Sequence, residues 1–109
     1  MKVVIVLTHA QLQGAYFQEA QRSAMMFSGL GHEVSFVLLD DGVLSLLEGE
    51  GYAFGLRKLG RLSGIDGLRV FALESSCRRL IPGAGTAGVE IIDDGAFAQM
   101  LLESKVVVF

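Results

Sequence analysis

The stretch KVVIVLT (Lys2–Thr8) is a continuous run of β-branched and apolar residues close to the start of the chain. A strand with one solvent-facing side alternates apolar and polar residues, whereas a strand covered on both faces is apolar throughout. The segment therefore predicts a strand inside a parallel sheet. Such a sheet needs helices on both of its faces, which makes the fold class α/β.

Helical and strand patterns alternate along the rest of the chain. Residues 13–30 predict a long helix, because apolar residues recur every three or four positions and glycines follow. Its expected apolar face is Leu12, Tyr16, Ala20, Ala24 and Phe27. Further strands are predicted at 33–39, 68–73, 89–92 and 105–109, and shorter helices at 56–62, 75–81 and 94–103. We therefore expect a single domain over residues 1–109, a three-layer α/β/α sandwich with a mostly parallel five-stranded sheet.

Composition restricts the classes of function. The net charge is −3, so no basic field favours direct binding to nucleic acid. Hydrophobic residues make up 51% of the chain and charged residues 19%. Apolar surface left over in a small chain favours association with another copy. No apolar run is long enough to span a membrane or to serve as a signal peptide. One cysteine excludes an intrachain disulfide, and together these features predict a cytoplasmic protein.

Polar residues follow three of the predicted strands directly. They are Thr8-His9, then Asp40-Asp41-Gly42, then Glu74-Ser75-Ser76-Cys77. In an open parallel sheet the functional crevice lies beyond the carboxyl ends of the strands, so these segments should meet there. Adjacent aspartates before a glycine are also typical of a tight turn, and we assign Asp40–Gly42 that role at the crevice.

Cys77 is the candidate catalytic residue, and two interpretations of it stay open. With Ser75 as the helix N-cap, Cys77 would lie in the first helical turn, where the helix dipole favours an anion. Arg78 and Arg79 would add positive potential and help to make a reactive thiolate. Alternatively, Cys77 shares a helical face with Leu80 and Ile81, and free cysteine is among the most buried residue types.

The remaining polar residues give weaker signals. His9, with Ser75 and Ser76, is a candidate pocket residue or general acid/base, although a loop role is equally open. Neither histidine has the spacing of a zinc site, so no metal is expected. The glycine-rich PGAGTAG at 82–88 lacks the Lys-Ser/Thr of a phosphate-binding loop, so no cofactor is expected.

Several of these segments together resemble a known family. They are GLGHEV, FVLLDDGVLSLLEG, LRVFALESSCRRLI, GVEIIDDGAFAQMLLES and VVVF. Over nearly the whole chain they are similar to the small DsrE/DsrF/DsrH proteins, whose relatives include the TusB, TusC and TusD sulfur-relay proteins. The resemblance implies a three-layer domain that forms dimers, trimers or hexamers with itself or with paralogous subunits.

The resemblance also implies an activity. Sulfur-relay members carry a persulfide on a cysteine and pass sulfur between donor and acceptor proteins, in tRNA thiolation or in sulfur oxidation. We therefore expect a sulfurtransferase-like persulfide carrier that uses Cys77. The alternative is a non-catalytic assembly subunit or a small-molecule-binding member. Family cysteines match Ala72 or Leu73 at the end of the third strand, or Ala24 in the long helix, and none of these is cysteine here.

Overall fold

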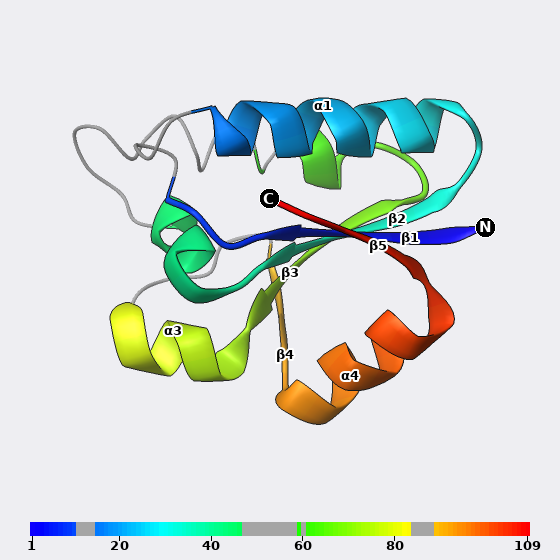
Figure 1. The fold of residues 1–109 in the computed structure, drawn as a ribbon. Helices are drawn as coiled ribbons and strands as arrows, with labels where there is room; N and C mark the ends of the chain where they lie inside the picture. The colour runs from blue at the N-terminus through cyan, green and yellow to red at the C-terminus, as the bar shows by residue number, and fades with distance from the viewer. Residues whose placement is uncertain (11–14, 47–58, 60, 84–88) are drawn as a thin grey trace.

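The structure, a computed structural model, describes residues 1–10, 15–46, 59, 61–83 and 89–109. Its centre is a five-stranded sheet with the order β4-β3-β2-β1-β5 (Figure 1). The strands are β1 (Lys2–Leu7), β2 (Glu33–Leu38), β3 (Leu68–Leu73), β4 (Glu90–Ile92) and β5 (Lys105–Val108). Every one of these strand pairs is parallel. The expected "mostly parallel" sheet is thus parallel throughout the described part of the chain.

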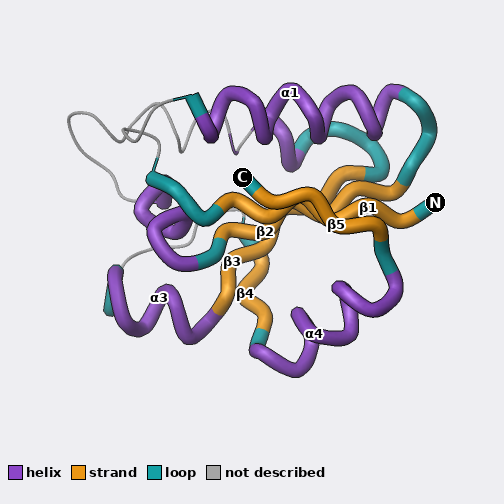
Figure 2. The backbone as a smooth tube through the Cα atoms, in the orientation of Figure 1, coloured by secondary structure: helices purple, strands orange, loops and turns teal. Residues whose placement is uncertain are grey.

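Helices cover both faces of the sheet, as the class requires. Helix α1 (Tyr16–Gly29) lies on one face and α4 (Asp94–Glu103) on the other (Figures 1 and 2). Helix α3 (Glu74–Leu80) lies at the carboxyl edge, where its apolar residues join the same core as α1. A 3-10 helix, η1 (Asp40–Leu46), follows β2 at the carboxyl edge of the sheet. Residues 59 and 61–63 are also helical, and the three layers agree with the predicted sandwich.

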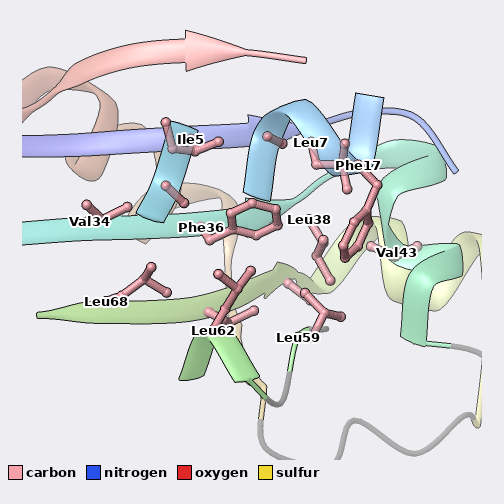
Figure 3. Packing of buried hydrophobic residues seen from close by; sticks show 14 of the residues in the cluster. Ile5, Leu7, Phe17, Val34, Phe36, Leu38, Val43, Leu59, Leu62 and Leu68 are labelled. Atoms are coloured by element: carbon pink, nitrogen blue, oxygen red, sulfur yellow. The ribbon is translucent and has the colours of Figure 1, made fainter. Parts of the chain in front are cut away.

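The first strand behaves as its sequence predicts. From Val3 to Leu7 every side chain of β1 is at most 2% exposed. Its odd-numbered residues join the core between the sheet and α1, in which Phe36 packs with Leu59 and Leu62 (Figure 3). Its even-numbered residues, Val4 and Val6, join a second and smaller cluster beneath α4. A strand that supplies side chains to two cores has no polar face, which explains the continuous apolar run.

The buried face of α1 differs from the expected one by one position. Phe17, Ala20 and Ala24 are buried, whereas Tyr16 is 42% exposed. The expectation for Tyr16 is therefore wrong, because Phe17 takes the place over the sheet and contacts Phe36. The predicted glycine end is confirmed: Gly31 follows the helix with φ +88°, a conformation that glycine adopts without strain.

Two predicted boundaries also shift at the carboxyl edge. The Asp40–Gly42 turn is the first part of the longer η1 rather than an isolated turn. Helix α3 begins at Glu74, and its N-cap is Leu73, which makes no side-chain capping bond. The predicted Ser75 cap is therefore wrong. Predictions for Leu12, for most of the loop and helix over 48–62 and for 84–88 lie outside the described residues.

Helix α4 matches its prediction closely. Asp93 caps it, since the Asp93 Oδ1 atom accepts a 2.7 Å hydrogen bond from the Ala96 N–H. Phe97, Met100 and Leu101 are only partly buried against the sheet, and none of the α4 side chains is fully buried. No helix in the described ranges has the length and apolar character needed to cross a membrane.

Candidate functional site

The ends of β2 and β3 are joined by polar contacts from Asp40. The Asp40 backbone N–H donates a 3.0 Å hydrogen bond to the hydroxyl of Ser76, which is only 3% exposed. The Asp40 carboxylate pairs with the Arg79 guanidinium, with 3.0 Å between Oδ1 and Nη2. The structure thus brings three of the predicted site residues together at the carboxyl edge. The strand-end rule anticipates the meeting of Asp40 and Ser76, whereas Arg79 was expected beside Cys77.

Close backbone packing joins this corner to β1. The Leu39 N–H donates a 3.0 Å hydrogen bond to the Leu7 carbonyl. Gly42 lies so near that a Cβ at this position would be 2.0 Å from the same carbonyl oxygen. Asp40 itself has φ 51°, in the left-handed region that Asp tolerates better than most residues. The glycine of the DDG sequence is therefore required by a close approach, and its first aspartate, Asp40, suits the left-handed turn.

Helix α3 directs the other candidate residues away from this corner. Ser75 donates a 3.2 Å hydrogen bond to Asp94, at the start of α4. Arg78 forms an ion pair with Glu74 of its own helix. Both Ser75 and Arg78 line a shallow hollow of about 320 Å³ between α3 and α4, together with Asp93 and Asp94. The candidate residues therefore belong to two separate surfaces rather than to one crevice.

Cys77 lies at the margin of the core and lines neither of these surfaces. Its side chain is partly buried and packs against the apolar cluster between the sheet and α1. Burial raises the pKa of the Cys77 thiol above its ordinary value. The positive charges expected beside it are held by Glu74 and Asp40, the partners of Arg78 and Arg79. The local environment favours the neutral thiol, which is a weak nucleophile.

His9 lies at the end of β1 in surroundings of its own. Its ring stacks on Tyr16, with 3.8 Å between centroids and 9° between planes. Its Nδ1 is 3.2 Å from the Thr8 hydroxyl, which donates a 2.9 Å hydrogen bond to the carbonyl of Phe109. These contacts tie His9 to α1 and β5, and no described contact joins it to Cys77.

The positions that match the family cysteines are buried. Ala72 and Ala24 are fully inaccessible, and Leu73 is 6% exposed. All three contribute packing: Ala72 and Ala24 lie in the main core, and Leu73 precedes α3. No thiol chemistry is available at these positions.

Two features of the structure were not anticipated from the sequence. The hydroxyl of Ser45 in η1 is buried and has no hydrogen-bond partner among the described residues. A hollow of about 560 Å³, lined by Glu33, Arg69, Phe71 and Met100 among others, lies beside α4 at the opposite end of the sheet from the candidate residues. Neither a buried serine nor a surface hollow has a sequence pattern from which it could be predicted. The described residues include no group of His, Cys, Asp and Glu suited to a metal ion.

The fold and its carboxyl edge define a small parallel α/β protein with helices on both faces of the sheet. No family model and no curated protein sequence matches the chain. Among solved structures it is similar to the ychN protein from E. coli, with a TM-score of 0.82 and 25% sequence identity. The similarity covers 100% of this chain and 99% of that one. It supports the DsrE/DsrF/DsrH-like fold that the sequence segments predict.

Proposed function

We propose that the chain is a non-catalytic, cytoplasmic DsrE/DsrF/DsrH-like protein of sulfur metabolism that acts as a subunit of an assembly. One observation carries the proposal: Cys77 is packed against the core and its thiol pKa is raised by burial. A persulfide carrier needs an accessible thiolate at neutral pH. Here the single cysteine of the chain favours the protonated form.

The arrangement of the arginines supports the same proposal. An activating cation must be free to stabilise the thiolate. Arg78 and Arg79 are instead engaged by carboxylates, and their side chains are largely exposed. In this proposal Arg79 holds α3 against η1 through Asp40, and Arg78 shapes the surface of the subunit. Partners are then further copies of the chain or related subunits, as the resemblance implies.

The competing function is persulfide transfer through Cys77, and one experiment separates the two. The native chain is incubated with a persulfide donor such as a loaded cysteine desulfurase, and its intact mass is measured. We expect no gain of a sulfur atom, and slow modification of Cys77 by a thiol reagent until the chain is unfolded. A persulfide on native Cys77 would refute the proposal.

A matched control makes the negative result informative. Ser75 is exposed and lies two residues before Cys77 on the same helix. The Ser75→Cys change in a Cys77→Ala background therefore places an accessible thiol on the exposed side of the same helix. This variant should react quickly with the reagent, which shows that the assay detects a thiol on α3.

A further inference from the structure

Strand β5 leaves one side of its backbone without a partner. It is an outer strand of the sheet and pairs with β1 alone among the described strands. Both backbone groups of Phe109 point toward β1: its N–H donates to the Val6 carbonyl and its carbonyl accepts from the Thr8 N–H, each at 2.7 Å. Successive residues of a strand point to alternate sides. The N–H and C=O groups of Val106 and Val108 therefore point outward.

The side chains of the same two residues are also uncovered. Val106 and Val108 stand beside Val4 and Val6 in register, on the face of the sheet that carries α4. Val4 and Val6 are buried, whereas Val106 is 39% and Val108 is 62% exposed. Leu102 of α4 is 81% exposed. Helix α4 thus covers β1 but leaves the valines of β5 in solvent.

The two outer strands differ in how they are protected against pairing. Natural edge strands avoid association by being very short or by carrying charges, prolines or bulges. Strand β4 has three residues, begins with Glu90 in an ion pair with Arg69, and is followed by Asp93. Strand β5 is KVVV, with Lys105 as its one charge, and has no proline or bulge. Within the described part of the chain, the edge at β5 is therefore the one open to another strand.

We propose that β5 pairs with β5 of a second copy of this chain in antiparallel orientation, on a two-fold axis through Val107, to form one continuous sheet across the dimer. This register places Val106 opposite Val108 of the second copy. Residues whose backbone groups point toward each other form the hydrogen-bonded pairs of an antiparallel ladder. Both outward-facing residues then find partners in each copy.

Charge decides the orientation of the second copy. In the antiparallel pair the two Lys105 side chains lie at opposite ends of the ladder, four residues apart along the strand, or about 14 Å. That separation exceeds the screening length of about 8 Å at physiological salt. A parallel pair would set the two lysines side by side without a carboxylate on either strand. A two-fold arrangement also makes the contact closed, so assembly stops at the dimer through this edge.

The inference rests on the proposed role as an assembly subunit and names the surface that it uses. The variant V106K/V108K places charges at the exposed edge positions, and Ile91→Lys does so on β4, where Ile91 is 37% exposed. Masses are measured by sedimentation and light scattering, and folding by circular dichroism. We expect the native protein to form an assembly with an even number of chains. The V106K/V108K variant should have half the mass of this assembly, and Ile91→Lys should keep the native mass.

Disulfide trapping tests the register independently, and remains decisive if V106K/V108K fails to fold. In a Cys77→Ala background, Val107→Cys should form a covalent dimer on oxidation, because residues on the axis approach closely. Val106→Cys should not, because its own copy lies more than about 7 Å away, beyond disulfide reach.

Each contrary outcome has a distinct meaning. A multimer whose mass falls with Ile91→Lys but not with V106K/V108K, or that traps through Val106→Cys, overturns the β5 interface while leaving the assembly role intact. A monomeric native chain overturns both. Persulfide uptake at Cys77 refutes the non-catalytic role and leaves the interface to be decided by the masses.

Discussion

The Ser76 hydroxyl accepts a 3.0 Å hydrogen bond from the backbone N–H of Asp40, which joins the segments that follow the paired strands β2 and β3. Asp40 stands in a left-handed conformation at the start of η1, and Ser76 is one of the few buried polar residues in the described structure. The bond satisfies a donor at the point where the chain turns sharply. It links η1 to α3 and so determines where both the Asp40 carboxylate and Cys77 lie.

Replacing Ser76 with alanine should therefore destabilise the protein. The change leaves the Asp40 N–H without its acceptor in a partly buried corner, and the loss of one such hydrogen bond costs about 0.5–1.5 kcal/mol. Chemical denaturation should show a lower midpoint with an unchanged slope. Ser75→Ala is the matched control, since the Ser75 bond to Asp94 lies on the exposed surface. Equal losses for the two variants would contradict the role assigned to Ser76.

Gly42→Ala should destabilise the protein for a steric reason. The added Cβ would lie 2.0 Å from the Leu7 carbonyl oxygen, so β1 and η1 would have to separate. Forcing atoms into a packed region costs about 1–3 kcal/mol, and more where backbone must move. A fall in the thermal midpoint measures the effect.

Gly29→Ala is the control for this substitution. Gly29 is the last residue of α1 and has no other atom within 4 Å of an added Cβ. Alanine favours helix over glycine by up to about 1 kcal/mol. The midpoint should rise or stay the same, and a fall as large as that of Gly42→Ala would show that the close approach to Leu7 is not the cause.

Phe36→Ala tests the core between the sheet and α1. Phe36 is fully buried in the middle strand and contacts Phe17 (Figure 3). Truncating a buried phenylalanine costs about 3–5 kcal/mol, through lost transfer energy and a residual cavity. Denaturant unfolding measures it. Phe27→Ala, at a partly buried position on α1, should cost clearly less, and similar losses would argue against Phe36 as the centre of the core.

These residues also show how far sequence reaches. The parallel sheet was predictable because a strand that feeds two cores must be apolar at every position, and Val3–Leu7 is. The Asp93 cap was predictable because capping depends on residues three apart. The presence of Phe17 rather than Tyr16 on the buried face of α1 was not predictable, since both residues fit a helical period within one position. Which of the two is buried depends on the position of Phe36 in the sheet beneath the helix.

The candidate site was less predictable for a related reason. The strand-end rule predicted that the Asp40 and Ser76 segments meet at one edge, and a hydrogen bond joins them there. Arg79 was expected beside Cys77, and it pairs with Asp40 instead. Within α3, however, the direction of each side chain depends on where the helix starts, and the start at Glu74 is set by the end of β3 rather than by a Ser75 cap. The degree to which Cys77 is exposed could therefore not be predicted from the sequence alone.

The titration of Cys77 gives a prediction with a definite sign. Burial raises the pKa of the folded thiol, so the unfolded chain loses the proton at lower pH than the folded chain does. The contribution of the neutral thiol to stability is fully present below the pKa of an unfolded cysteine, about 8.5, and is lost as pH rises through the folded value. The free energy of unfolding of the native chain should thus decline more steeply above about pH 8.5 than that of Cys77→Ala. Denaturant unfolding of both chains at a series of alkaline pH values measures the difference. Parallel curves would mean that Cys77 ionises equally well in the folded and unfolded states. An activated thiol would instead make the native chain gain stability relative to Cys77→Ala as pH rises. That result would indicate a persulfide carrier rather than a packing residue.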